Sequence, residues 1–324
     1  NESQRVELVR PTEQGGCALD ALWNDDFHHT ARVALTGQRE AYYIDYCGSP
    51  QELISTVKWG YLYQGQWYQW QGKHRGTPTR GLQPGTFVNY LENHDQVSNS
   101  GFGERIHTYS NAGCYRALTA LLLLGPATPM LFQGQEFGAS SPFMFFADHN
   151  PQLAKLVRKG RMEFVSQFPS LATPESQARL PDPCNPETFE ACKLNLMERK
   201  SHIEIYKLHQ DLLKLRREDP VFRTQAAGGI DGAVLGPQAL VLRFFGADGD
   251  RLLLINLGAD MSFDPAPEPL IAPPENATWS TLWSSEHPDY GGRGVLLASG
   301  EGNWVLQGSS ALVLTSDKHE QFQF

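Results

Sequence analysis

Acidic and histidine side chains follow short apolar runs at three places in this sequence. The three segments are "WNDDFHH" (23–29), "NHDQVSN" (93–99) and "FQGQE" (132–136). If the apolar runs are parallel strands, the loops that follow them gather on one face of the sheet, where active sites are commonly built. We therefore expect one shared mouth for Asp25, Asp26, His28, His29, His94, Asp95 and Glu136.

Aromatic side chains in the intervening segments suit the walls of such a mouth. The candidates are Phe27, Tyr42, Tyr43, Tyr46, Trp67, Tyr68 and Trp70. Carboxylate, amide and imidazole groups bond to the hydroxyl groups of a sugar, and an aromatic ring packs against the C–H face of a sugar ring. This combination of residue types favours a carbohydrate ligand.

Each of these residues also has a purely structural interpretation. Asp25 and Asp26 suit the first turn of a helix, where acidic side chains cap free N–H groups and complement the helix dipole. The paired histidines and the tryptophans suit a packed core, and Glu136 suits the anchor of a turn. Asp95 is different, because an acid that ends a buried strand is costly unless it is used.

A metal site is the alternative chemistry, because clustered aspartates and histidines ligate zinc or a pair of divalent ions. The sequence contains neither His-x-x-x-His nor His-Glu-x-x-His, the usual spacings of zinc ligands on a helix. We therefore expect no metal ion and no organic cofactor.

Short apolar runs and capping residues predict alternating strands and helices in the first two thirds of the chain. The expected strands are 17–23, 87–91 and 128–137, and the expected helices are 26–37, 49–60, 111–125 and 201–219. Gly37 would end the first helix in a left-handed conformation. Ser49 with Glu52, and Ser201 with Glu204, predict capping boxes that begin two of the others.

Past Phe222 the pattern changes to short strands separated by glycine-containing turns, which indicates an all-β domain. We expect an α/β domain over residues 1–225 and a smaller β-sandwich domain over residues 226–324.

Composition narrows the possible partners and the compartment. The chain has 324 residues and a formal net charge of -9, whereas a nucleic acid or an anionic membrane would need a basic face. The five cysteines are odd in number and contain no C-x-x-C pair, so a reducing compartment, the cytoplasm, is expected. Residue 1 is Asn and the first methionine is Met130, so we expect the chain to begin inside a longer protein.

Several segments together resemble one enzyme family. "FVNYLENHDQVSN" resembles the fourth shared motif of the α-amylase superfamily, glycoside hydrolase family 13, in which an Asn-His-Asp or Val-His-Asp ends the seventh barrel strand. "DALWNDDFHHTARVALTGQREAYYIDY", "ATPMLFQGQEFGASSPFMFFADH" and "CKLNLMERKSH" resemble the maltooligosyltrehalose trehalohydrolases more narrowly, as does "LWSSEHPDYGG" near the C-terminus.

The resemblance implies a fold and an activity. The fold would be part of a (β/α)8 TIM barrel, about strands six to eight with their helices, followed by an all-β sandwich domain. The activity would be a retaining hydrolysis of the α-1,4 bond that joins a trehalose end to a maltooligosaccharide, releasing trehalose. The substrate would be maltooligosyltrehalose or another α-glucan.

The resemblance also implies roles for individual residues. Asp95 matches the carboxylate that stabilises the transition state, with His94 beside it to hold sugar hydroxyl groups. Residues that match the lining of the substrate cleft are Asp25, Asp26, Phe27, His28, His29, His94, Gln96, Val97, Ser98 and Asn99. Tyr42, Trp70 and Gln71 fall near positions that would contact the trehalose end.

In the family, a segment similar to "NESQRVELVRP" comes directly after the general acid, so the acid and the nucleophile are expected before Asn1. A retaining mechanism needs both carboxyl groups. We therefore expect the isolated chain to be inactive, and also prone to aggregate because three barrel strands leave open edges.

Two other interpretations remain open. One is another enzyme of the α-amylase superfamily, of the glycogen-branching or α-amylase type. The other is a non-catalytic carbohydrate-binding protein, which would need no nucleophile or general acid.

Overall fold

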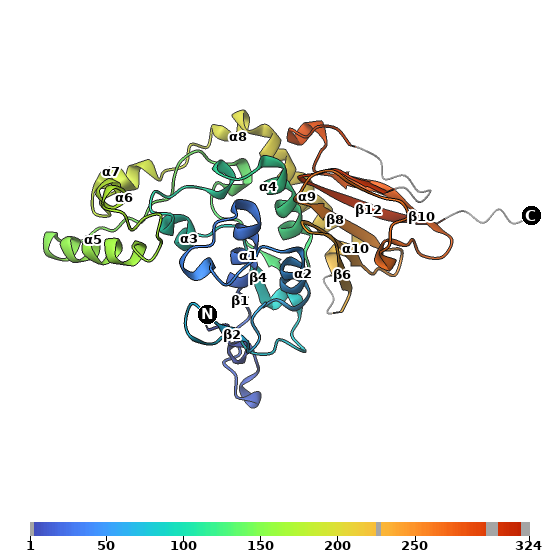
Figure 1. Ribbon diagram of the computed structural model, residues 1–324, viewed down its shortest axis with the longest axis horizontal. Coiled ribbons are helices and arrows are strands. Elements are labelled where there is room, and N and C mark those ends of the chain that lie inside the picture. The colour runs from blue at the N-terminus through green and yellow to red at the C-terminus, as the bar shows by residue number, and fades with distance from the viewer. Residues whose placement is uncertain (1–2, 225–227, 296–303, 319–324) are drawn as a thin grey trace, which may run out of the picture.

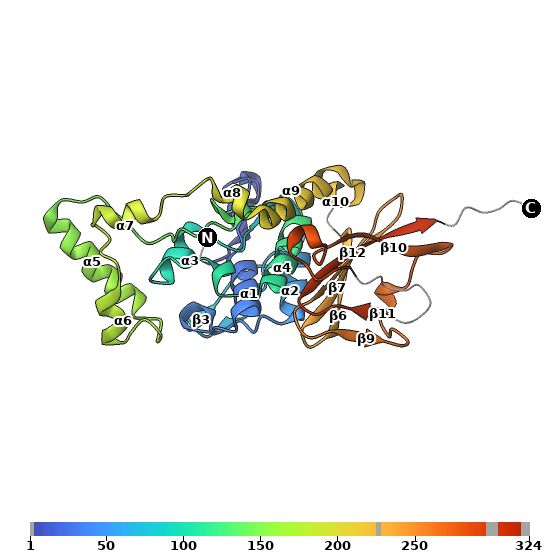
Figure 2. The same cartoon turned by 90° about the horizontal axis from the view of Figure 1, so that it is seen from above.

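The computed structural model describes residues 3–224, 228–295 and 304–318. The molecule is elongated, with three parts in a row (Figures 1 and 2). Helices α5 to α7 form one end, a small parallel sheet with its helices lies in the middle, and an antiparallel sheet forms the other end. The bounds of the two predicted domains fall at residues 225 and 226, which lie outside the described residues.

The helices of the described part are α1 (Asp25–Thr36), α2 (Pro50–Trp59), α3 (His94–Asn99), α4 (Ala112–Leu124), α5 (Pro151–Val165), α6 (Pro174–Arg179), α7 (Pro186–Ala191), α8 (Glu198–Ser201), α9 (Ile203–Glu218) and α10 (Pro220–Thr224). The strands are β1 (Leu22–Trp23), β2 (Trp67–Tyr68), β3 (Lys73–His74), β4 (Phe87–Asn89), β5 (Thr128–Pro129), β6 (Ile230–Gly236), β7 (Ala239–Phe244), β8 (Arg251–Asn256), β9 (Met261–Phe263), β10 (Ala277–Ser284), β11 (Trp304–Leu306) and β12 (Ser310–Lys318).

The middle part is built on a three-stranded parallel sheet with the order β1-β4-β5. Leu22 pairs with Phe87, and Val88 pairs with both Trp23 and Thr128, so all three strands run in one direction. The strands are short, and a larger barrel around them stays a prediction. What matters for function is that the ends of β1 and β4 lie side by side.

Capping residues bound three of the helices, at the two predicted places and at one more. Gly37 ends α1 with a φ of 69°, which is the left-handed cap expected of a glycine there. Ser49 and Glu52 form the predicted capping box of α2, and Pro50 occupies the first helical position. Asn111 caps α4 by accepting hydrogen bonds from two backbone N–H groups.

The capping box predicted at Ser201 and Glu204 is wrong. Ser201 is the last residue of α8, and its hydroxyl donates to the carbonyl of Glu198. The backbone turns at His202, with φ -110° and ψ 43°, and α9 begins at Ile203 without a side-chain cap. The short helix α8 thus ends where the sequence predicted that the long helix would begin, and α9 starts two residues later.

The C-terminal part is a five-stranded antiparallel sheet with the order β10-β12-β8-β7-β6, beside a two-stranded sheet of β9 and β11. Side chains of a strand alternate between the two faces of its sheet. Leu240, Leu242 and Leu253 therefore pack on one face against α2 and α4, in a core that also contains Leu208 and Leu212 of α9. Val241 and Leu254 pack on the opposite face, toward β11 and Ile271.

Both faces of the five-stranded sheet are thus buried, and one of them is continuous with the core of the helical part. Two ion pairs reinforce the contact between the two parts. Lys58 pairs with Asp231 at 2.6 Å, and Arg116 pairs with Glu286 at 2.5 Å.

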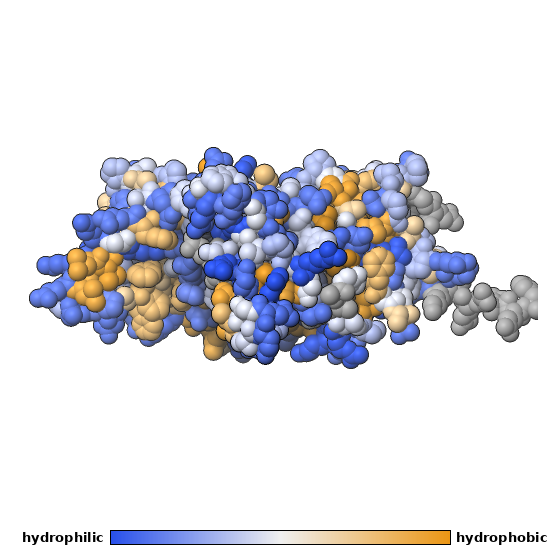
Figure 3. Space-filling model, turned by 90° about the horizontal axis from the view of Figure 1, so that it is seen from below, coloured by the Kyte–Doolittle hydropathy of each residue, from blue (hydrophilic) through white to orange (hydrophobic). Residues whose placement is uncertain are grey.

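The opposite end of the molecule exposes apolar side chains. Leu153, Leu156 and Phe164 on α5 are 41%, 66% and 44% exposed, and Figure 3 shows apolar side chains gathered at this end. Within the described residues, no helix is both long enough and apolar enough to cross a membrane.

Candidate functional site

The ends of β1 and β4 bring together two of the three predicted segments. The hydroxyl of Tyr90, one residue past β4, donates to a carboxylate oxygen of Asp25, the first residue of α1. The ring of Trp23 makes edge contacts with Tyr90 at 5.6 Å and with His94 at 6.1 Å between ring centres. Side chains 65 or more residues apart in the sequence thus share one surface.

A cavity of about 770 Å³, called the first cavity below, opens at these strand ends. Its size falls within the range of about 300–1,000 Å³ that is usual for small-molecule sites. Ten residues singled out from the sequence line it: Asp25, His29, Tyr42, Tyr68, Trp70, Gln71, His94, Asp95, Gln96 and Asn99. Their predicted roles in substrate binding stay predictions, but the structure does bring them together.

Other lining residues were missed by sequence reasoning. Trp23 is the last residue of β1, so its place beside "NDDFHH" was a usable signal. Arg75 lies in an irregular loop, and Phe164 and Gln167 belong to α5 and the residues just after it. These three carry no sequence pattern that points to the cavity, because only the path of the folded chain brings them there.

Nine of the singled-out residues do not line the first cavity: Asp26, Phe27, His28, Tyr43, Tyr46, Trp67, Val97, Ser98 and Glu136. Tyr43 and Tyr46 are buried, and Trp67 is 58% exposed. Asp26, Phe27, His28, Val97 and Ser98 are buried behind its wall. Glu136 lies in the 3₁₀ turn η6 (Gln135–Phe137) and pairs with Arg199 at 3.5 Å, which agrees with the turn-anchor interpretation. The expected position of Asp26, His28 and Glu136 at the mouth is therefore corrected.

Asp95 lies on an exposed part of the cavity wall and not at the end of a buried strand. β4 ends at Asn89, and Asp95 is in the first turn of α3, where Asn93 accepts hydrogen bonds from the backbone N–H groups of Asp95 and Gln96 at 3.0 Å. The argument that Asp95 is costly because it is buried is thus wrong. The buried acid of this segment is Glu92, which is 2% exposed.

Glu92 is held by neighbours outside the first cavity. One of its carboxylate oxygens accepts a hydrogen bond from the backbone N–H of Ile106, and the guanidinium of Arg105 lies nearby. Burial raises the pKa of Glu92 to about 7. This residue was not singled out from the sequence, although its place directly before Asn93 made it a candidate.

Hydrogen bonds fix the orientation of the Asp95 side chain. Asn99, one turn later on α3, donates from Nδ2 to Oδ1 of Asp95 at 3.2 Å, and the same nitrogen is 3.3 Å from the hydroxyl of Tyr42. Arg161 of α5 donates to Oδ1 of Asn99 at 2.8 Å and to the carbonyl of Ser98 at 2.7 Å. α5 is thus connected to the carboxylate of Asp95 through the side-chain amide of Asn99.

Asp26 is buried behind the wall of the first cavity and holds neighbouring segments in place. Its carboxylate accepts hydrogen bonds from the hydroxyl of Tyr46 at 2.5 Å and from the backbone N–H groups of Leu62 and Tyr63 at 2.7 and 2.8 Å. The guanidinium of Arg75 lies 3.7 Å away. These four groups lock the loop after α2 onto the start of α1.

Arg75 joins Asp26 to the lining of the first cavity. The arginine is 3% exposed, lies 4.0 Å from a carboxylate oxygen of Asp25, and stacks 4.6 Å above the ring of Tyr68. Burial raises the pKa of Asp25, while the hydrogen bond from Tyr90 and the charge of Arg75 lower it in part. The cavity thus contains two carboxylates in different surroundings, Asp25 paired and Asp95 exposed.

The two adjacent histidines have different positions. Nδ1 of His28 lies 2.8 Å from the carbonyl of Leu91, so it carries the proton, and Nε2 accepts from the hydroxyl of Tyr43 at 3.1 Å. Burial lowers the pKa of His28 to about 3, so its ring is neutral. Burial also lowers the pKa of His29, which lines the first cavity. A neutral imidazole there can exchange hydrogen bonds with a hydroxyl group.

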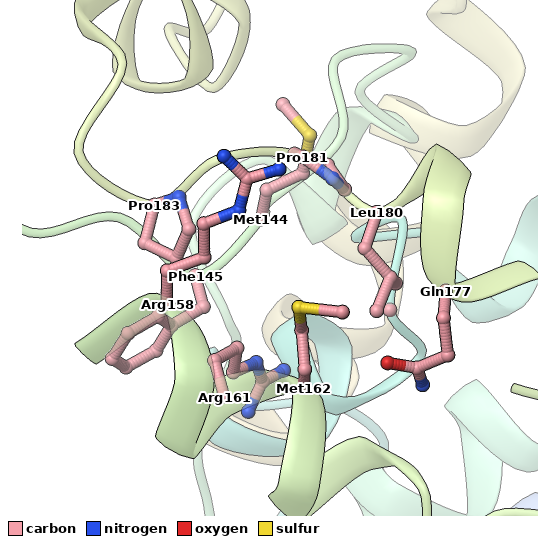
Figure 4. Close-up of a pocket in the computed structure, with 10 residues that line it drawn as sticks. Met144, Phe145, Arg158, Arg161, Met162, Gln177, Leu180, Pro181 and Pro183 are labelled. Atoms are coloured by element: carbon pink, nitrogen blue, oxygen red, sulfur yellow. The ribbon is translucent and has the colours of Figure 1, made fainter. Parts of the chain in front are cut away.

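A small hollow between α5, α6 and the loop at Phe145 is too small for a ligand. Figure 4 shows Met162, Leu180 and Gln177 around it, and its volume of about 20 Å³ is near that of a single water probe. Among the residues that the structure describes, no group of three or more His, Cys, Asp or Glu side chains is arranged to hold a metal ion.

Comparison with known proteins gives one family match and several named relatives. Residues 227–313 match a family described as "Domain of unknown function (DUF3459)". The chain is 41% identical over 250 residues to the malto-oligosyltrehalose trehalohydrolase of Deinococcus radiodurans, which is 75% of this chain and 40% of that protein. It is 36% identical to the enzyme of the same name from Arthrobacter ramosus, over 66% of this chain and 37% of that protein.

The chain therefore spans about two fifths of the length of these relatives. Its fold is similar to a solved structure described as a putative alpha amylase from Salmonella typhimurium, with a TM-score of 0.76 and 28% identity over 98% of this chain and 50% of that chain. An alpha-amylase from H. orenii shares the fold, with a TM-score of 0.51 and 14% identity over 97% of this chain and 52% of its own. The resemblance in the sequence motifs is thus confirmed: this chain is related to the malto-oligosyltrehalose trehalohydrolases and has an α-amylase-like fold.

Proposed function

We propose that this chain belongs to a glycoside hydrolase that cleaves the α-1,4-glucosidic bond next to the trehalose end of maltooligosyltrehalose and releases trehalose. The observation that supports this most is the first cavity, where Asp95, His94 and Asp25 lie among aromatic rings at adjacent strand ends. The relatives that match the chain are named for this activity.

In this proposal Asp95 stabilises the positive charge that develops on the sugar during bond cleavage. The carboxylate is exposed to the cavity and is oriented by Asn99, so it needs no rearrangement to face a sugar ring. Removing one such electrostatic group commonly costs about 2.7–4 kcal/mol in the barrier. His94, exposed beside it, would exchange hydrogen bonds with the hydroxyl groups of the same ring.

The aromatic side chains of the cavity would hold the flat faces of sugar rings. Trp23 and Trp70 are 42% and 40% exposed, so each presents part of its ring to a ligand. Asp25, whose orientation is set by Tyr90 and Arg75, would accept hydrogen bonds from hydroxyl groups farther along the substrate.

A retaining reaction also needs a nucleophile and a general acid about 5–5.5 Å apart. We propose that both are supplied by residues before Asn1, as the sequence resemblance implies. The 324-residue chain alone would then bind the substrate but release no trehalose.

The test is to express the longest reading frame that contains this chain and to incubate it with maltooligosyltrehalose. We expect trehalose among the products, and we expect Asp95→Asn to lower kcat by about two orders of magnitude or more. Asp248→Asn, in the exposed turn between β7 and β8, is the matched control and should be as active as the wild type.

Other products would contradict the proposal in different ways. Release of glucose or maltose, or formation of branched glucan, would indicate another enzyme of the α-amylase superfamily. Binding without any turnover by the longest reading frame would indicate a carbohydrate-binding protein. Full activity of Asp95→Asn would remove Asp95 from the mechanism.

A further inference from the structure

A second cavity, of about 430 Å³, lies directly beside the first. Tyr42, Gln96 and Asn99 line both cavities, so a single layer of side chains separates them. Tyr42 and Gln96 are half-buried, which means that the edge of this wall reaches solvent. An extended ligand in the first cavity can therefore continue over the wall into the second.

Contacts between distant segments hold the second cavity in shape. The carboxylate of Glu40 accepts hydrogen bonds from the backbone N–H of Ser170 at 3.1 Å and from its hydroxyl at 2.8 Å. The ring of Tyr42 packs edge-on against Phe168, with ring centres 5.4 Å apart. The segment after α5 is thus fastened to the residues that precede and form η3 (Ala41–Tyr43), and the cavity between them is preformed.

The charges around the second cavity are balanced. Two guanidinium groups, of Arg32 and Arg179, face two carboxylates, of Glu40 and Glu104. Arg32 is already engaged, because it stacks 4.1 Å above the ring of Tyr43 and donates to Gln38 at 3.0 Å. A phosphate or carboxylate ligand would need an excess of available positive charge, so a neutral ligand fits this site better.

The remaining lining is aromatic and hydroxylic, with Phe102, Tyr109 and Phe168 beside Ser100 and Ser170. Aromatic faces next to hydroxyl and carboxylate groups suit a neutral molecule that has both C–H faces and hydroxyl groups. This description fits a sugar ring, and the volume fits a small ligand.

The shared wall also offers an unused hydrogen-bond acceptor. Oε1 of Gln96 is buried and has no hydrogen-bond partner among the described residues. Buried polar atoms in proteins nearly always have a partner, and a hydroxyl group from a ligand at the wall would supply one.

We propose that the second cavity is an additional sugar subsite, which binds glucosyl rings of the same oligosaccharide whose other rings occupy the first cavity. The inference rests on the proposed function, because it assumes that the first cavity binds an α-glucan. It adds that long oligosaccharides bind better than short ones, since only a long chain reaches past Tyr42 and Asn99.

The test measures the Kd of the protein encoded by the longest reading frame that contains this chain, for maltotriose and maltoheptaose, by isothermal titration calorimetry. We expect the wild type to bind maltoheptaose at least about tenfold more tightly, which corresponds to about 1.4 kcal/mol. Ser170→Trp places a large ring in the second cavity and should weaken maltoheptaose binding about tenfold, while the Kd for maltotriose stays unchanged.

Two controls separate this effect from damage elsewhere. Ser166 is exposed at the end of α5 and lines neither cavity, so Ser166→Trp should leave both Kd values unchanged. Trp70 lines only the first cavity, so Trp70→Ala should weaken both ligands.

The outcomes that overturn the inference are distinct from those that overturn the proposed function. Equal binding of the two ligands by the wild type, or an equal loss for both in Ser170→Trp, would overturn the second subsite alone. An effect of Ser166→Trp as large as that of Ser170→Trp would do the same. A wild-type chain that binds neither ligand would overturn the first cavity as a glucan site, and the inference with it.

Discussion

The side-chain amide of Asn99 donates a hydrogen bond to the carboxylate of Asp95, with 3.2 Å between Nδ2 and Oδ1. Both residues belong to the short helix α3, so one helical turn sets their relation. The other end of the amide is held by Arg161, which comes from a different part of the chain. The orientation of Asp95 therefore depends on how α5 packs against α3.

Arg161→Met should weaken glucan binding without unfolding the protein. The change removes charge-assisted hydrogen bonds to Asn99 and to the carbonyl of Ser98, which are commonly worth about 1.5–3 kcal/mol each. We expect the Kd for maltoheptaose to rise about tenfold or more, as measured by calorimetry. Arg158→Met, on the same helix and paired with Asp182 at the surface, is the control and should bind normally. Equal Kd values for both variants would contradict the role of Arg161.

Arg75→Met should destabilise the fold strongly. Arg75 is 3% exposed and lies between the carboxylates of Asp25 and Asp26, so its removal leaves buried negative charge without a cation. Breaking a buried ion pair from one side typically costs about 3–5 kcal/mol. Urea unfolding should show a loss of this size, whereas Arg80→Met, at an exposed position, should change the free energy of unfolding by less than about 0.5 kcal/mol. A loss below about 1 kcal/mol for Arg75→Met would show that Asp26 is satisfied by its hydrogen bonds alone.

Glu92 should make the protein less stable as the pH rises from about 4.5 to about 7. Its pKa is about 7 in the folded state and 4.5 in the unfolded chain, so the folded state holds the proton throughout this interval while the unfolded state releases it. The expected loss is on the order of 3 kcal/mol. Glu92→Gln keeps an acceptor for Ile106 and should flatten the dependence of unfolding free energy on pH. An unchanged slope in the variant would assign the effect to other groups.

His28 should make the protein less stable as the pH falls below about 6.5. Its pKa is about 3 when folded and 6.5 when unfolded, so below pH 6.5 the unfolded chain binds a proton that the folded protein does not. Stability contributed by the neutral ring is therefore lost as the pH falls from 6.5 toward 3. In His28→Gln this part of the acid dependence should disappear, as followed by thermal unfolding at pH 4 and pH 6.5. Equal slopes in variant and wild type would show that His28 is protonated in the folded state.

Local signals in the sequence predicted the helices more fully than the strands. The capping box at Ser49 and the glycine at 37 act within a few residues, so they could be identified directly. The strand expected at 17–23 is only Leu22–Trp23, because the backbone N–H groups of Ala18 and Leu19 bond to the carbonyls of Arg10 and Leu8. The strand expected at 128–137 ends at Pro129, since a turn at Gly134 follows.

The residues of the candidate site also fall into those that local sequence signals could place and those that they could not. Asp25, His94 and Asp95 follow strands and belong to recognisable segments, so they could be placed together before the structure was known. Arg75 and Phe164 could not, because their positions depend on contacts between segments far apart in the chain. Asp95 was chosen partly for a wrong reason, since the burial assigned to it belongs to Glu92.

The five-stranded sheet has one further consequence, for how this protein can be divided. The family match at residues 227–313 marks a unit of sequence, yet Leu240, Leu242 and Leu253 pack into the same core as Leu118 and Leu212. A truncation at residue 226 would cut through that core and expose apolar surface on both pieces. The two parts therefore have to be produced together, and a recombination event that exchanged one of them would also have to supply a matching surface on the other.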